Sequence, residues 1–176
     1  MTANTISIRA LSAAETAERS AGLAAVLIDC VEGGASVSFM APLPQQKAEG
    51  FWLAVAAGIG HGERVLIVAE DGGGELVGTV VLVFGQPENQ PHRADLSKML
   101  VHRHARRCGT GAALMQAAEE AARAAGKTLL VLDTASADAE RLYRRAGWTR
   151  VGVVPGFALL PHGGACDTTY FYKQLG

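Results

Sequence analysis

The sequence has little of what marks a nucleic-acid partner, a membrane protein or a disulfide-rich scaffold. Its 176 residues carry a net charge of −1, so no overall basic charge favours nucleic acid or an anionic membrane. The three cysteines, Cys30, Cys108 and Cys166, form no C-x-x-C pair, and their odd number argues against a disulfide framework and a zinc site. No apolar run approaches the ~20 residues that a membrane span needs. We therefore expect no metal, no nucleic acid and no membrane partner.

The N-terminal residues lack a basic segment followed by an apolar one, so they do not resemble a signal peptide. We expect a cytoplasmic protein. A chain of this length, 49% apolar and 19% charged, suits one domain with a sizeable core, here residues 1–176.

Glycine and proline divide the chain into short periodic segments. Alternating or β-branched segments predict strands at residues 5–11, 64–70, 75–84, 93–101, 128–133, 148–154 and 168–173. Helical spacing of apolar residues, with Ser12 and Pro42 as start signals, predicts helices at residues 12–30, 42–57, 110–125 and 137–146. The order β-α-α-β-β-β-α-β-α-β-β predicts an α/β (α+β) domain, a central mixed twisted sheet of about 6–7 strands flanked by about four helices.

The stretch from Leu96 to Met115, LSKMLVHRHARRCGTGAALM, joins a predicted strand to a long helix through a basic turn. Bare N–H groups and the helix dipole favour an anion at a helix N-terminus. Gly109 and Gly111 allow a phosphate to approach the backbone closely. Arg106 and Arg107 lie in the turn and can add charge-assisted hydrogen bonds to the phosphate. The segment predicts a phosphate-binding turn, and a turn that only caps the helix is the alternative.

The common phosphate motifs fit this stretch less well. A P-loop needs a lysine directly after its second glycine, and Gly111 is followed by Ala112. A Rossmann fingerprint needs a third glycine at the position of Leu114.

Two separated motifs carry a family resemblance. Residues 106–111, RRCGTG, resemble the Gln/Arg-x-x-Gly-x-Gly/Ala motif of the GCN5-related N-acetyltransferases, the GNAT family. Residues 139–148, AERLYRRAGW, resemble the A-x-x-L/F-Y-x-x-x-G-F/W/Y element of the same family. The likeness extends over nearly the whole chain. It implies an acyltransferase that moves an acetyl group directly from acetyl-CoA to an amine, without a metal.

Segments outside those motifs, such as residues 33–40 (GGASVSFM) and 155–157 (PGF), resemble the tabtoxin resistance proteins, which acetylate a toxic β-lactam amino acid. This likeness implies a common subfamily, though not necessarily a common substrate. The preferred acceptor is a small amino-acid-like amine, in toxin or antibiotic detoxification. The chain departs from the family pattern at Arg107, where glycine is common, and at Ser136, where asparagine is common. Arg107 could strengthen phosphate binding or disturb a turn that needs glycine.

The family resemblance implies a coenzyme A site between the strands at 96–101 and 128–133. Pantetheine would pair with the backbone of the first strand, the pyrophosphate would bind the turn, and a backbone N–H near Leu100 or Val101 would hold the thioester oxygen. The residues expected to bind the cosubstrate are Met99, Leu100, Val101, Arg106, Arg107, Cys108, Gly109, Thr110, Gly111, Ala112 and Ser136.

Three side chains are candidates for catalysis. The resemblance makes Tyr143 the general acid toward the departing thiolate, although its place on an apolar helix face also suits a core residue. An alkyl ammonium, with a pKa near 10.4, must lose its proton before it can attack. Asp133 and Asp95 are the candidate bases, but parallel strands would put them at opposite ends of the sheet. Asp133 could equally cap the next helix, and Asp95 could be an exposed edge residue.

By resemblance, the acceptor pocket would involve the 30–40 loop, the second helix and the 155–166 connection. The candidate lining residues are Glu32, Ser36, Phe39 and Trp52, although we favour core positions for the two aromatic ones. Transfer to a protein lysine or N-terminus is an alternative that would need a long open groove. A non-catalytic acyl-CoA-binding sensor is another. We expect a monomer or a homodimer.

Overall fold

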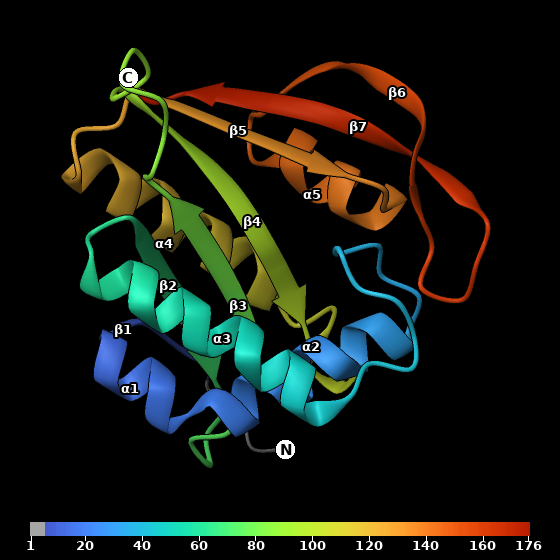
Figure 1. Cartoon of the computed structure of the whole chain (residues 1–176). Coiled ribbons are helices and arrows are strands. Elements are labelled where there is room, and N and C mark those ends of the chain that lie inside the picture. Colours follow the sequence, from blue (N-terminus) through green and yellow to red (C-terminus); the bar gives the residue numbers. More distant parts are fainter. Residues whose placement is uncertain (1–5) are drawn as a thin grey trace.

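The computed structural model describes residues 6–176 (Figure 1). In chain order the elements are β1 (Ser7–Leu11), α1 (Ala13–Glu18), α2 (Ser20–Glu32), α3 (Gln45–Gly60), β2 (Arg64–Glu70), β3 (Leu76–Val83), β4 (Arg93–Val101), the 3₁₀ turn η1 (Arg103–Ala105), α4 (Thr110–Ala124), β5 (Leu129–Thr134), α5 (Ala137–Arg145), β6 (Thr149–Leu159) and β7 (Ala165–Gln174). Residue 5, included in the first predicted strand, lies outside the described residues.

The strands form one mixed sheet in the order β1-β2-β3-β4-β5-β7-β6. Only β4 and β5 are parallel, and every other neighbouring pair is antiparallel. The predicted hairpin turn between β2 and β3 is closed by Asp71, whose side chain accepts the backbone N–H groups of Gly73 and Glu75. The predicted fold class, a single α+β domain around a mixed sheet, is confirmed.

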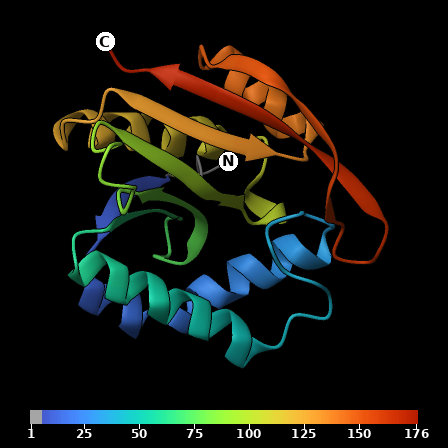
Figure 2. The ribbon, with the colours of Figure 1, turned by 45° about the horizontal axis from the view of Figure 1, so that its top comes forward.

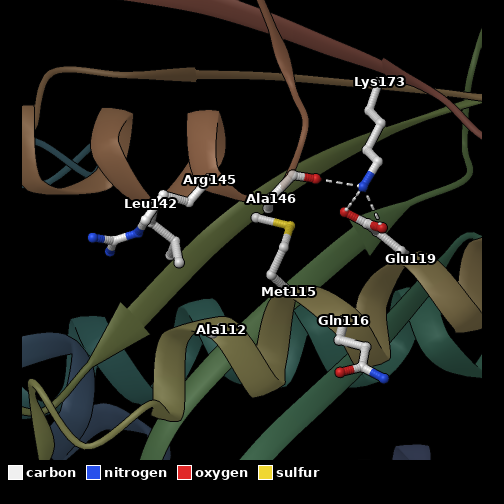
Figure 3. Close-up of a pocket in the computed structure, with 8 residues that line it drawn as sticks. All are labelled: Ala112, Met115, Gln116, Glu119, Leu142, Arg145, Ala146 and Lys173. Carbon is white, nitrogen blue, oxygen red and sulfur yellow. Dashed lines mark hydrogen bonds and ion pairs between the residues drawn. The ribbon is translucent and has the colours of Figure 1, made fainter.

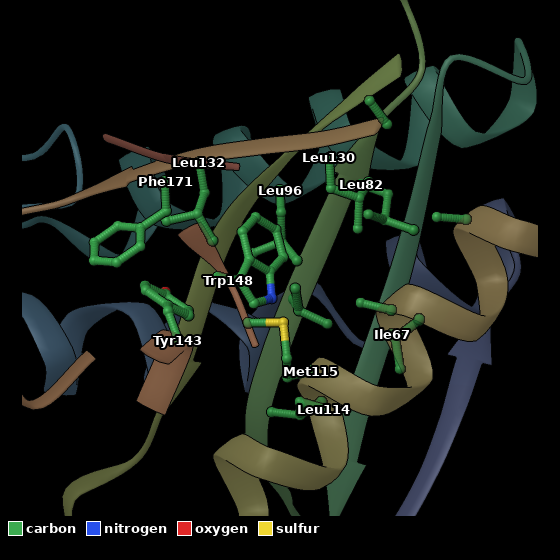
Figure 4. Close-up of a cluster of buried hydrophobic side chains, with 14 of the residues drawn as sticks. Ile67, Leu82, Leu96, Leu114, Met115, Leu130, Leu132, Tyr143, Trp148 and Phe171 are labelled. Carbon is green, nitrogen blue, oxygen red and sulfur yellow. The ribbon is translucent and has the colours of Figure 1, made fainter. Parts of the chain in front are cut away.

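Successive strand residues point to opposite faces of the sheet, and each face has its own apolar core. Ile67 and Leu82 pack with Leu114 of α4 and Tyr143 of α5 on one face (Figure 4). Their neighbours, such as Leu66, pack against α2 and α3 on the other face. Figure 2 shows the sheet between these two layers of helices. The sheet is therefore buried in its centre, which explains the nearly continuous apolar sequence of β2 and β3.

The helices differ from the prediction at two places. The segment predicted as one helix over 12–30 is two helices that meet at Arg19, whose guanidinium binds Glu70 and the carbonyl of Gly74. The helix predicted from Pro42 begins instead after Pro44, because a following proline disfavours helical backbone at Leu43.

Ser12 caps α1 as predicted, and Glu15 completes a capping box. None of the helices among residues 6–176 is both long and apolar enough to cross a membrane.

Candidate active site

A cleft opens between β4 and β5. The two strands pair only over three positions, the last of which joins Asp95 to Val131. Beyond it β4 continues to Val101 and β5 to Thr134, and the two strands diverge (Figures 1 and 2). Side chains leave a cleft of about 810 Å³ there. The backbone edge of β4 that faces this cleft has no partner strand, so its N–H and C=O groups can bind a ligand.

A β-bulge bends β4 beyond the last position at which it pairs with β5. The register with β3 shifts between Thr79 and Val81, opposite Lys98 and its neighbour. Lys98 has a φ of +49°, and the hydroxyl of Thr79 donates to its carbonyl at 2.8 Å. A bulge turns the strand and increases its twist, so this irregularity explains why β4 leaves β5.

The basic turn before α4 closes one end of the cleft. Gly109 has a φ of +83°, and no side chain caps the first-turn N–H groups of α4. A Cβ at Gly111 would lie 3.2 Å from Leu142, so glycine there permits the close packing of α4 against α5. Arg106 crosses the turn and donates from Nε to the carbonyl of Val101 at 2.9 Å. Bare amides at a helix N-terminus beside Arg106 and Arg107 are features that suit an anion.

Nine of the eleven residues predicted to bind a cosubstrate line this cleft: Met99, Leu100, Val101, Arg106, Arg107, Gly109, Gly111, Ala112 and Ser136. Cys108 and Thr110 do not. The Cys108 thiol turns back to the carbonyl of Arg106 at 3.4 Å, and the buried Thr110 hydroxyl donates to the carbonyl of Ala105 at 3.2 Å. The turn remains formed with arginine at position 107, where φ is +62°. Ser136 also caps α5 by accepting the N–H of Ala139.

Tyr143 belongs to the core and to the cleft at once. Its ring packs between Trp148 and Phe171, with ring centroids at 5.9 and 5.7 Å (Figure 4). The residue is buried, yet it contributes to the lining of the cleft. Its hydroxyl has no hydrogen-bond partner among residues 6–176. Burial, followed by the charge of Asp133, raises the pKa of Tyr143 above its ordinary value, so the hydroxyl keeps its proton at neutral pH.

The structure separates the two carboxylates that the sequence offered as bases. Asp133 lines the cleft near the end of β5, and the hydroxyl of Thr168 donates to it at 2.7 Å. Asp133 does not cap α5, since Ser136 does. Asp95 lies at the closed end of the strand pair, outside the cleft lining, where it binds Arg93 and Gln86. Only Asp133 is placed to meet a ligand in the cleft.

Comparison with known proteins agrees with this geometry. The family model described as the acetyltransferase (GNAT) family matches residues 38–148, more than half of the chain. The chain belongs to the GNAT family of acetyltransferases. The seven-stranded sheet and the open β4–β5 pair are therefore those of a GNAT domain.

Solved structures resemble the GNAT domain over nearly its whole length. An N-acetyltransferase from Staphylococcus aureus Mu50 superposes with a TM-score of 0.80 at 16% identity, covering 98% of this chain and 99% of the other. A ribosomal-protein-alanine N-acetyltransferase from Brucella melitensis gives 0.79 at 23% identity, with coverages of 96% and 99%. A phosphinothricin acetyltransferase from Sinorhizobium meliloti, in complex with AcCoA, gives 0.79 at 19% identity, with coverages of 98% and 89%. At these identities the likeness shows the fold alone.

The predicted acceptor residues of the GNAT domain fall into two groups. Ser36 lines the cleft, and the exposed Glu32 lies at the end of α2 beside it. Trp52 is fully buried, and Phe39 packs edge-on against Phe51 at 5.4 Å between centroids. The two aromatic residues are therefore core or near-core residues, as favoured from the sequence.

Two distant loops meet beside the cleft, close to Ser36. The loop between α2 and α3 binds the turn between β6 and β7 through Ala41 N–H, which donates to the carbonyl of Pro161 at 2.9 Å. His162 Nε2 lies 3.0 Å from the carbonyl oxygen of Glu32, and the thiol of Cys166 donates to Ser36 at 3.5 Å. These contacts join the loops across this side of the molecule (Figure 2). Ser36 and Leu160, from the two joined loops, belong to the lining of the cleft.

A second, smaller cavity of about 320 Å³ lies between α4 and the C-terminal part of α5 (Figure 3). At its edge the ammonium of Lys173 donates to both carboxylate oxygens of Glu119, at 2.8 and 2.7 Å, and to the carbonyl of Ala146 at 2.6 Å. Trp148 Nε1 donates to the same carboxylate at 3.1 Å. This network fastens the C-terminal end of α5 to α4 and β7, and so fixes the helix that carries Tyr143. No local pattern in the sequence indicates this network.

Proposed function

We propose that this protein is an acetyl-CoA-dependent N-acetyltransferase that acts on a small amino-acid-like amine. One observation carries the proposal: the unpaired edge of β4 joins the bare N-terminus of α4 to Tyr143 and Asp133 within a single cleft. The crystallised phosphinothricin acetyltransferase with AcCoA supports acetyl-CoA as the cosubstrate, and its name gives a small molecule as acceptor.

The residues of the cleft fit coenzyme A. The first-turn amides of α4, together with Arg106 and Arg107, suit a pyrophosphate. The backbone edge of β4 at Met99 and Leu100 has no partner strand and suits the amides of pantetheine, which would pair with it as a short strand does. The carbonyl of Val101 already accepts from Arg106. Acetyl-CoA supplies an acetyl group activated as a thioester. A backbone N–H near Leu100 or Val101 would donate to the oxygen on which negative charge develops.

Two side chains would transfer the protons of the reaction: one would accept a proton from the amine, and the other would donate a proton to the leaving sulfur. The carboxylate of Asp133, fixed by Thr168, can bind the acceptor ammonium and accept its proton, directly or through water. The protonated hydroxyl of Tyr143 can donate a hydrogen bond, and then a proton, to the sulfur that leaves. Asp95 has no part in this scheme, because it lies at the closed end of the strand pair.

The joined loops favour a small acceptor over a protein segment. The contacts of Ala41 with Pro161 and of Ser36 with Cys166 hold two loops together beside Ser36, which lines the cleft. A peptide acceptor needs a groove that its chain can enter and leave. Tyr143 and Asp133, both in the cleft lining, also favour an enzyme over a sensor that only binds acyl-CoA.

The proposal is tested by release of free thiol from acetyl-CoA with a panel of amines: amino acids, β-lactam amino acids, polyamines, aminoglycosides and N-terminal peptides. We expect turnover with one or more of the amino acids. Calorimetry should show binding of both acetyl-CoA and CoA. Binding without turnover of any amine would favour a sensor, turnover of peptides alone would favour a protein acetyltransferase, and no binding would exclude the proposal.

Arg107 gives a prediction that separates strain from charge. Arg107→Gly should be more stable than Arg107→Ala by about 1 kcal/mol, because alanine, like arginine, is strained in left-handed backbone. Both variants lose the cation, so both should bind acetyl-CoA about fivefold more weakly, as expected for one exposed charged hydrogen bond. Chemical denaturation and calorimetry measure the two effects. Equal stabilities of the variants would contradict the strain, and unchanged affinity would contradict the phosphate contact.

A further inference from the structure

Lys98 is a cation in the cleft that the proposed chemistry does not use. It lines the cleft from the bulge of β4 and is buried by more than half. Its ammonium points toward the loop between α2 and α3. It lies 3.5 Å from the hydroxyl of Ser38 and 5.4 Å from the centroid of the Phe51 ring. Among residues 6–176 it forms no ion pair within 4.0 Å. Its neighbours are a hydroxyl and an aromatic ring, so a ligand carboxylate would supply the anion that a charge-assisted hydrogen bond needs.

The backbone around this ammonium is strained. Ser38, Lys98 and Arg107 are the three non-glycine residues of the described chain with positive φ, at +77°, +49° and +62°. Each costs on the order of 1–2 kcal/mol in left-handed backbone. Lys98 and Arg107 line the cleft, and Ser38 binds the Lys98 ammonium. Strain of this kind concentrates at sites that position functional groups, and here it directs two cations into one cleft.

The two cations serve different ends of the cleft. Arg107 stands at the N-terminus of α4, where the pyrophosphate would bind. Lys98 stands beside the α2–α3 loop, where Ser36 meets Cys166. Asp133 lines the same cleft and is near enough for its charge to favour the charged form of Lys98, although burial lowers the pKa of Lys98. The two charges lie more than 4 Å apart, so they do not form a direct ion pair.

We infer that Lys98 binds the carboxylate of an amino-acid acceptor, while Asp133 binds its ammonium. The inference rests on the proposed function and names the acceptor class: a zwitterionic α-amino acid, whose opposite charges match the separated lysine and aspartate. Ser38 would add a hydroxyl to the same carboxylate. An acceptor amine without an acidic group would leave the Lys98 ammonium unpaired, and a polyamine would place a second cation near it. Lys98 is therefore a specificity-determining residue.

The test compares each amino acid with its α-carboxamide. Values of kcat/KM are measured for alanine, serine and threonine and for their amides, with wild type, Lys98→Met, Lys98→Gln and Lys98→Arg. Relative to wild type, the acid-to-amide ratio should fall about 10- to 100-fold in the Met and Gln variants, because a hydrogen bond to a charged group is lost. The Arg variant should retain most of the preference. Lys47→Met, on the exposed face of α3, should leave the ratio unchanged.

A second measurement needs no variant. N-acetylalanine should inhibit the wild-type enzyme more strongly than N-acetylalaninamide by about tenfold or more, because only the acid can pair with Lys98. Equal inhibition, or an acid-to-amide ratio that Lys98→Met leaves unchanged, would overturn the assignment while acetyl transfer itself stands. If no amine is acetylated although acetyl-CoA binds, the proposed function fails first, and the assignment of Lys98 fails with it.

Discussion

Tyr143→Phe should lower kcat for acetyl transfer about 100- to 1000-fold, which is the usual contribution of a general acid. The ring of Tyr143 packs against Trp148 and Phe171, and phenylalanine keeps this packing. Only the hydroxyl is lost, and that hydroxyl has no partner among residues 6–176. Acetyl-CoA affinity and thermal stability should therefore stay almost unchanged, so the loss appears in kcat. Single-turnover kinetics and calorimetry separate the two quantities.

The pH dependence gives this prediction a second readout. The folded-state pKa of Tyr143 is raised by burial and by the charge of Asp133. A raised pKa in an acid means that the neutral form persists through the pH at which a free tyrosine ionises, about 10. Loss of activity between pH 8 and about 10 should therefore not come from Tyr143, and Tyr143→Phe should keep the shape of the wild-type profile in that range.

The same raised pKa affects stability in one direction. The stability that this raised pKa contributes is fully present below about pH 10, the pKa of an unfolded tyrosine. It is lost as the pH rises through the folded-state pKa of Tyr143.

Tyr172→Phe, on β7 and outside the cleft lining, is the matched control and should retain wild-type kcat. A Tyr143→Phe enzyme with wild-type kcat would remove this residue from proton transfer.

Local chemistry in the sequence was enough to predict the fold and one end of the cleft. The strands β2 and β4 begin and end at the predicted residues, because their boundaries are set by local turn signals. The turn at residues 106–111 could be recognised because an anion site at a helix N-terminus needs only bare amides, glycine and nearby cations. Each of these features lies within one short segment.

Features set by distant contacts could not be predicted in this way. Nothing in residues 13–32 interrupts a helix, and the break at Arg19 coincides with its bonds to Glu70 and the carbonyl of Gly74. The bulge that turns Lys98 into the cleft depends on register with β3. The contact of Ala41 with Pro161 joins two loops that lie about 120 residues apart in the chain. Periodicity carries no information about such pairings.

The ion pair between Lys173 and Glu119, at the C-terminal end of α5, gives the largest expected effect on stability. Lys173→Met should lower the free energy of unfolding by about 2–4 kcal/mol, because it leaves the buried carboxylate of Glu119 without its main partner. Arg123, at 3.7 Å, compensates in part, which places the effect toward the lower end of the range for buried ion pairs. The carbonyl of Ala146 also loses its donor (Figure 3). A fall in Tm of about 5–12 °C corresponds to this loss in a chain of this size.

A second substitution should restore part of the free energy of unfolding that Lys173→Met loses. In Glu119→Gln/Lys173→Met the buried charge is gone, and the glutamine oxygen can still accept from Trp148 Nε1. The double variant should therefore be more stable than Lys173→Met alone, as measured by chemical denaturation in a double-mutant cycle. Because α5 carries Tyr143, Lys173→Met should also lower kcat more than it weakens acetyl-CoA binding, since the α4 turn is untouched. Additive losses in the cycle would show that the pair does not hold α5 as a unit.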